Sequence, residues 1–159
     1  MPKGSILQSS NAYNCAVLTA HEDMFNGDPS TDVLSMANYR EIVFYIVKSA
    51  GATGTATITV ESCDDVTPTT ATAVAFNYRA TTTGNTLGAY TAAAAAGFAT
   101  TAGTNQMYEV SIQADQLNGS DQYVRLVATE VVDSPCDGAI ISVGFWPRYA
   151  EDQPVEMIT

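Results

Sequence analysis

Basic side chains are scarce in this chain. Its 159 residues contain six Lys and Arg against seventeen Asp and Glu, which gives a formal net charge of −11. The phosphates of DNA or RNA and the headgroups of an anionic membrane would be repelled by this field, and no cluster of basic residues offsets it locally. No apolar run approaches the roughly 20 residues that cross a bilayer. We therefore expect neither a nucleic acid nor a membrane as a partner.

Residues that carry common chemistries are also few. His21 is the only histidine, and no GxSxG motif accompanies it, so a Ser–His–Asp type of catalytic site is not expected. The three cysteines, Cys15, Cys63 and Cys136, lie far apart without the spacing of zinc ligands, and we expect three free, mostly buried thiols. The sequence therefore predicts no catalytic residue and no enzyme activity.

Signals for bound ions and cofactors are similarly weak. The acids in the turns at 28–32 and 61–65 lack the alternation of an EF-hand loop, and we interpret them as solvated turn residues rather than calcium ligands. The Gly-rich stretch SAGATGTA has no lysine and no following helix, so it does not form a phosphate-binding loop. We expect no metal and no cofactor.

Charge is nearly absent from the middle of the chain. Arg79 is the only charged residue between Val66 and Tyr108, and the segment is rich in Thr, Ala and Gly with few bulky side chains. Such a segment cannot be mostly core, and a soluble acidic monomer usually spreads charge over its surface. We therefore expect this stretch to pack against another copy or a larger assembly. Within it, Thr91–Phe98 (TAAAAAGF) is either a short helix or loop of little consequence, or an excursion that docks on a neighbour.

What the sequence does contain is alternation typical of strands. Residues 41–48 (EIVFYIVK) are apolar on both faces, as in the middle of a sandwich, and residues 55–63 (TATITVESC) alternate apolar and hydroxyl side chains. The Gly-rich SAGATG between them predicts a hairpin of strands 41–48 and 54–63. Residues 32–39 are either one helical turn or an irregular entry into the first long strand. Further strands are expected around 14–19, 74–78, 108–114, 123–130 and 139–146.

These elements predict an all-β fold, an antiparallel β-sandwich or jelly roll with a long uncharged loop and extended terminal arms. We divide the chain into an N-terminal arm (1–13), a β-sandwich domain (14–146) and a C-terminal tail (147–159). The N-terminal segment has no continuous apolar region of the secretory type, so we expect synthesis in a host cytoplasm.

The aromatic ending FWPRY at 145–149 is the best interface signal. Phe145 and Trp146 are successive in the expected strand, so one of them points away from the core; alternatively Trp146 caps its own core. Trp, Tyr and Arg dominate interface hot spots. The candidate interface residues are Tyr90, Phe98, Trp146, Arg148 and Tyr149.

Several segments together resemble a known class of proteins. They are a short polar N-terminal arm, SMANYREIVFYIV followed by GATGTATITVESCDD, the uncharged Thr/Ala-rich loop, YVRLVATEV, and the closing strand into FWPRY. In this layout the chain resembles accessory structural proteins of tailed-bacteriophage virions, particularly those that decorate or cement the capsid. The resemblance implies a β-sandwich that assembles as a dimer or trimer on the major capsid protein or another virion protein, located in the virion and without enzymatic activity.

Two alternatives remain open at this point. One is another phage particle component, such as a head–tail connector or tail protein. The other is a carbohydrate- or receptor-binding β-sandwich, which predicts an exposed aromatic platform, Trp146 or Tyr149, with nearby acids or Ca²⁺.

Overall fold

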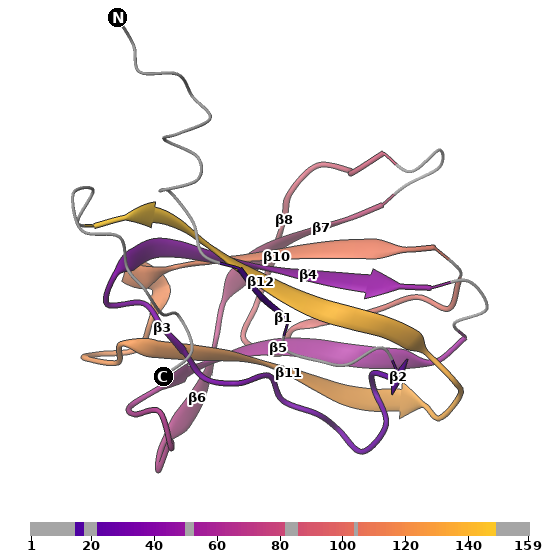
Figure 1. Ribbon diagram of the computed structural model, residues 1–159, viewed down its shortest axis with the longest axis horizontal. Helices are drawn as coiled ribbons and strands as arrows, with labels where there is room; N and C mark the ends of the chain where they lie inside the picture. Colours follow the sequence, from indigo (N-terminus) through magenta and orange to yellow (C-terminus); the bar gives the residue numbers. More distant parts are fainter. Residues whose placement is uncertain (1–14, 18–21, 50–52, 82–85, 104, 149–159) are drawn as a thin grey trace, which may run out of the picture.

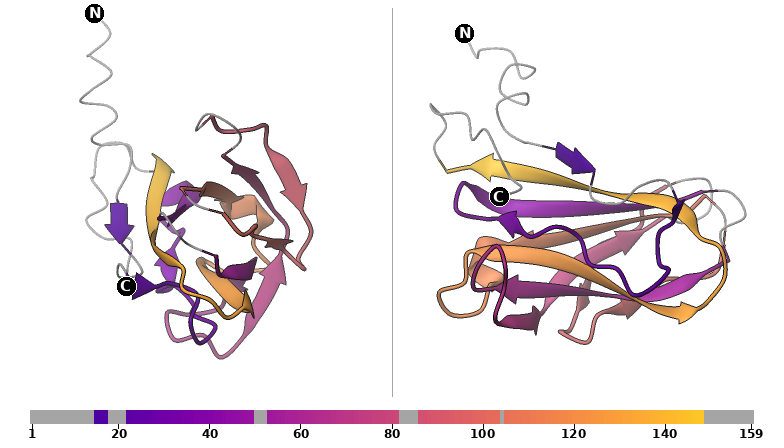
Figure 2. Two further views of the ribbon diagram at one scale, coloured as in Figure 1. Left: turned by 90° about the vertical axis from the view of Figure 1, so that its right-hand side faces the viewer. Right: turned by 60° about the horizontal axis from the view of Figure 1, so that its bottom comes forward.

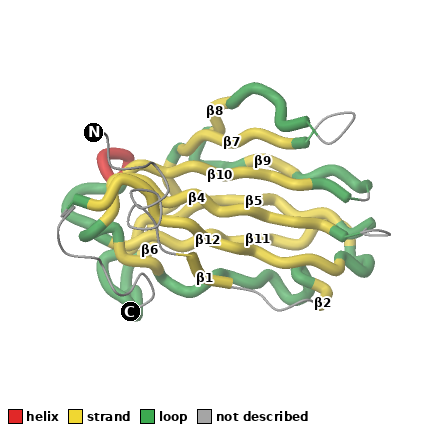
Figure 3. The backbone as a smooth tube through the Cα atoms, turned by 45° about the horizontal axis from the view of Figure 1, so that its top comes forward, coloured by secondary structure: helices red, strands yellow, loops and turns green. Residues whose placement is uncertain are grey.

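Two antiparallel sheets pack face to face in the computed structural model, which describes residues 15–17, 22–49, 53–81, 86–103 and 105–148 (Figure 1). Within those residues the chain is almost entirely strand, with one short 3₁₀ helix, η1 (Ala114–Gln116) (Figure 3). The predicted all-β antiparallel sandwich is confirmed. The expected arm 1–13 and most of the tail 147–159 lie outside the described residues.

The larger sheet has seven strands in the order β1-β12-β4-β10-β7-β8, with β2 paired to β12. Its strands are β1 (Cys15–Val17), β2 (Glu22–Asp23), β4 (Tyr39–Lys48), β7 (Phe76–Ala80), β8 (Thr91–Ala93), β10 (Met107–Gln113) and β12 (Asp137–Pro147). The smaller sheet has five strands in the order β3-β11-β5-β6, with β9 also paired to β5. Its strands are β3 (Leu34–Ser35), β5 (Thr55–Cys63), β6 (Ala71–Val74), β9 (Phe98–Ala99) and β11 (Tyr123–Val132).

The hydrophobic core lies between the two sheets and explains the apolar character of β4. This strand pairs with β12 on one side and β10 on the other, and its residues Ile42, Phe44 and Ile46 are fully buried. Ile58 and Leu126 of the smaller sheet belong to the same buried cluster. Burial of such side chains is the main stabilising term of the sandwich.

The predicted hairpin of strands 41–48 and 54–63 is wrong, because β4 and β5 lie in different sheets. Lys48, only 1% exposed, ends β4 and donates hydrogen bonds from Nζ to the carbonyl oxygens of Gly54 (3.0 Å) and Thr101 (2.8 Å). The backbone N–H groups of Ser49 and Thr53 donate to the carbonyl oxygens of Asp137 and Pro135, respectively. The chain therefore passes from β4 in the larger sheet to β5 in the smaller one, and the local turn composition does not encode this change of sheet.

One further expectation needs correction, and one pair of alternatives is decided. The alternation at 74–78 is not one strand, since the chain changes sheets at Ala75: β6 pairs with β5 and β7 pairs with β10. For residues 32–39 the helical alternative is wrong and the irregular entry into β4 is confirmed: the short strand β3 pairs with β11, and bends at 37–38 lead into β4. The expected strands near 14–19, 108–114, 123–130 and 139–146 correspond to β1, β10, β11 and β12.

The alanine run at 91–98 also crosses between the sheets, and it is not a helix (Figure 2). β8 pairs with β7 in the larger sheet, a turn follows, and β9 pairs with β5 in the smaller sheet. Gly97 makes this crossing possible, because its φ is +77° and an added Cβ would overlap the carbonyl oxygen of Ile58. The expected long uncharged loop is thus partly strand and is tied to its own domain.

Candidate functional site

Trp146 is the most exposed large apolar side chain of the described residues, at 67%. It falls in β12 between the pairs Phe145–Glu41 and Pro147–Tyr39, which places it opposite Arg40 of β4. Its φ of +55° is a left-handed conformation that bulky residues rarely adopt. The alternative in which Trp146 caps its own core is therefore wrong, and the indole faces solvent.

A hollow of about 490 Å³ opens beside this residue, near the end of β12. It is formed by the neighbouring strands β12, β4 and β10 together with η1. The side chains around it combine one indole with two guanidinium groups, two carboxylates and an amide. They are those of Trp146, Arg148, Arg40, Glu41, Asp115 and Gln113, with Ala114 between them. A second hollow of about 300 Å³ shares Ala114 and Arg148 with the first.

Local hydrogen bonds fix part of the hollow's wall. The Arg148 backbone N–H donates to Asn38 O (2.9 Å), and Arg148 Nε donates to Tyr39 O (3.4 Å). Glu41 Oε1 accepts from Ser111 Oγ (2.5 Å). The two ion pairs found in the described part of the chain involve neither Arg40 nor Asp115. The wall thus offers charged donors and acceptors that are not already neutralised by one another.

Tyr90 belongs to a separate polar cluster on the outer face of the larger sheet. Arg79 Nη2 pairs with Glu109 Oε2 at 2.7 Å, and the Tyr90 hydroxyl donates to Glu109 Oε1. The Arg79 guanidinium also lies over the Tyr90 ring, 4.6 Å from its centroid. Partial burial, and then the hydrogen bond to Glu109, raise the pKa of Tyr90 to about 12. Arg79, the only charged residue between Val66 and Tyr108, therefore has its ion-pair partner, Glu109, within the same chain.

One side of the sandwich is formed by residues without charge, which we call the uncharged edge. It comprises β6, β8 and the turn 94–96. β6 and β9 follow one another along the same edge of β5, and the crossing from β8 to β9 places β8 on that side too (Figure 2). Most of its residues are exposed: Ala71, Thr72, Ala73, Thr91, Ala92, Ala94, Ala95 and Ala96.

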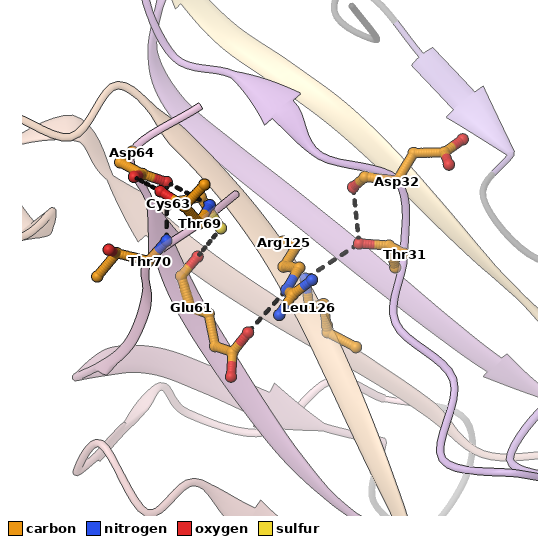
Figure 4. Close-up of polar contacts among 9 residues, drawn as sticks. All are labelled: Thr31, Asp32, Glu61, Cys63, Asp64, Thr69, Thr70, Arg125 and Leu126. Atoms are coloured by element: carbon orange, nitrogen blue, oxygen red, sulfur yellow. Dashed lines mark hydrogen bonds and ion pairs between the residues drawn. The ribbon is translucent and has the colours of Figure 1, made fainter. Parts of the chain in front are cut away.

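The turn acids have structural roles in the smaller sheet (Figure 4). Asp64 accepts hydrogen bonds from the Thr69 hydroxyl and from the backbone N–H groups of Thr69 and Thr70. These bonds, that from the Thr69 hydroxyl first, lower the pKa of Asp64. Glu61 Oε2 pairs with Arg125 Nε at 2.7 Å across β5 and β11. Both acids are explained by the fold.

The cysteine prediction is confirmed for the two residues whose side chains are described. Cys63 and Cys136 are free and buried. Burial raises the pKa of Cys63 to about 11, so this thiol is protonated at neutral pH. Within the described ranges no group of three or more His, Cys, Asp or Glu side chains could hold a metal ion. No helix found there is long and apolar enough to cross a membrane.

The five candidate interface residues are distributed over the molecule. Trp146 and Arg148 meet at the hollow, whereas Tyr90 lies on the outer face of the larger sheet. Phe98 is 9% exposed and stacks on Tyr78 in the core, so its ring is not on the surface. Tyr149 lies outside the described residues, as does His21.

Sequence reasoning did not single out Arg40, Glu41, Gln113 or Asp115, although they complete the wall of the hollow. Polar residues near the ends of strands have no pattern that separates a binding residue from a solvated one. The strand register brings them together: Gln113 lies opposite Glu41, and Arg40 opposite Trp146.

Comparisons with known proteins give a likeness at low sequence identity. No family model matches the chain. No curated protein matches it either. Among solved structures, that of the SPBc2 prophage-derived protein YomS is similar with a TM-score of 0.46 and 15% sequence identity, over 84% of this chain and 93% of that one.

Proposed function

We propose that this protein is a non-enzymatic structural component of a tailed-bacteriophage virion, one that decorates or cements the capsid by binding to copies of itself and to the major capsid protein. The observation that carries the proposal is the uncharged edge in a chain whose net charge is −11. The resemblance of the sequence to virion accessory proteins supports the same class of role.

The charge distribution favours self-association through this edge. Two copies with the same negative charge repel one another wherever their acidic surfaces meet, and the repulsion is weakest where charge is absent. Thr and Ala side chains can also be covered without stranding an unpaired charge, which would be costly. A partner of opposite charge would gain nothing from a neutral surface.

Backbone hydrogen bonding offers a way to make the contact. β8 ends the larger sheet and β6 ends the smaller one, so each has a side that no other described strand pairs. Free strand edges readily accept a strand from another chain unless charge or proline prevents it. An interface of about 800 Å² per partner is enough for specific binding, and repetition around a symmetric shell makes occupancy durable.

A charge placed on the uncharged edge tests the proposal. The protein would be added to purified phage particles that lack it, and the bound fraction measured after sedimentation. Ala94→Glu, on the exposed turn after β8, is expected to lower occupancy at least about tenfold, because each contact would then bury an unpaired carboxylate. Ser120→Glu adds the same charge at an exposed turn elsewhere and serves as the matched control.

Two results would contradict the proposal. One is equal occupancy of Ala94→Glu and Ser120→Glu. The other is the absence of the wild-type protein from particles made in cells that express it. Light scattering after size exclusion adds an independent check, since a dimer or trimer is expected and Ala94→Glu should shift it toward monomer.

A further inference from the structure

We infer that the hollow beside Trp146 is a binding site for a neutral oligosaccharide. This goes beyond a role in capsid assembly, and it uses none of the residues of the uncharged edge. A decoration protein does not require such a site, and the two assignments can fail independently.

The size of the hollow suits a small ligand. Binding sites for small molecules commonly enclose about 300–1,000 Å³ and place a few polar groups around an apolar surface. The hollow of about 490 Å³ falls in this range, and its wall comes from three paired strands and η1. Strands hold side chains more rigidly than loops, so the groups are positioned before a ligand arrives.

Trp146 provides the apolar surface. The exposure of its ring, 67%, leaves a large apolar area in water, and its left-handed φ of +55° is an unfavourable backbone conformation. Unfavourable conformations of this kind cluster at ligand sites. The C–H face of a pyranose ring is flat and weakly positive, and it stacks on the electron-rich face of an indole.

The polar groups match hydroxyls better than ions. Glu41 and Asp115 accept hydrogen bonds, Arg40 and Arg148 donate them, and the Gln113 amide does both. The two guanidinium groups and the two carboxylates give the wall no net charge, so the carboxylates repel an anion and the guanidinium groups repel a cation. A neutral polyol can satisfy both kinds of group through its hydroxyls, each of which donates and accepts.

The chain carries its own probe for the test, because Trp146 is its only tryptophan. The full-length protein would be titrated with neutral hexasaccharides of glucose, mannose and N-acetylglucosamine while tryptophan fluorescence is recorded. We expect at least one of them to give a saturable change in the emission of Trp146. The absence of a saturable change with all three at millimolar concentration would overturn the inference.

A variant that keeps the probe locates the site. Asp115→Asn should weaken binding of the responsive sugar about tenfold, because one charge-assisted hydrogen bond is lost. Asp133→Asn, an exposed acid that is not part of the hollow, is the matched control and should bind within about twofold of wild type. Equal affinity of the two variants would overturn the assignment of the hollow.

A protein ligand is the competing occupant. If Asp115→Asn abolishes sedimentation of the protein with added capsid particles, and no sugar competes with that binding in the wild type, the hollow is a protein contact and the inference is wrong. Retained particle occupancy with lost sugar binding in Asp115→Asn would support both assignments at once. Circular dichroism confirms that each variant is folded.

Discussion

Phe98 lies face to face with Tyr78, with ring centroids 3.9 Å apart and planes inclined by only 2°. The stack joins β9 of the smaller sheet to β7 of the larger one, and Phe76 and Tyr108 also contact Phe98 at centroid distances of 6.1 and 5.6 Å. A residue from the alanine-rich crossing therefore completes the core between the sheets.

Replacement of Phe98 by alanine should destabilise the fold by about 3–5 kcal/mol, since it removes buried aromatic surface and leaves a cavity. Urea unfolding followed by circular dichroism measures the free energy of unfolding. Val131→Ala, at a strongly exposed position of β11, is the control and should change it by less than about 0.5 kcal/mol. Equal stability of the two variants would show that Phe98 is not part of the core.

Replacement of Gly97 should destabilise the fold for two separate reasons. Its φ is positive, and an added Cβ would overlap the carbonyl oxygen of Ile58. Gly119 shares the first, with φ +57°, but an added Cβ there meets nothing within 4 Å. Gly119→Ala should therefore cost about 1–2 kcal/mol, and Gly97→Ala about 1–3 kcal/mol more, because backbone must also shift. Urea unfolding of the pair separates the conformational cost from the steric one, and equal costs would contradict the close packing of the crossing on β5.

The sequence was sufficient for the fold class because strand alternation is local. Residues 41–48 show why: Ile42, Phe44 and Ile46 face the core, while Val43 is covered on the other face by its neighbours in a central strand. Alternation of side-chain type indicates that a segment is extended and which of its side chains lie on each face. It does not indicate which other strand the segment pairs with.

Pairing therefore had to come from the structure. The composition after Lys48 is typical of a hairpin turn, yet β4 and β5 lie in different sheets. The Lys48 ammonium group donates hydrogen bonds to the carbonyl oxygens of Gly54 and Thr101. The pattern at 74–78 continues across Ala75 although the partner strand changes there. The hollow beside Trp146 could not be predicted for the same reason, because strand pairing brings its wall together from segments that are far apart in the sequence.

Removal of the acid from the Arg79–Glu109 ion pair should destabilise the fold less than removal of the base. Glu109 is only 4% exposed, and Arg79→Met leaves its carboxylate with the Tyr90 hydroxyl alone. Glu109→Gln keeps a carbonyl that accepts from Arg79. We expect Arg79→Met to cost about 1–3 kcal/mol and Glu109→Gln clearly less, with the double variant more stable than Arg79→Met. Urea unfolding of the four proteins measures this cycle, and the opposite ranking would refute the burial of this charge.

Tyr90 should make the stability of the protein depend on pH at the alkaline end. Its folded pKa is raised from 10.0 to about 12, so the folded state holds the phenolic proton more tightly than the unfolded state does. The resulting stabilisation is fully present below pH 10 and is lost as the pH rises through about 12. The Tyr90→Phe variant has no phenolic proton to lose at this position. The free energy of unfolding of the wild type should therefore fall more than that of the variant between pH 10 and about 12. Subtracting the two free energies removes the contribution of the other groups that titrate in this range. Unfolding free energies measured at several pH values test this, and parallel curves for the two proteins would mean that folding does not raise the pKa of Tyr90.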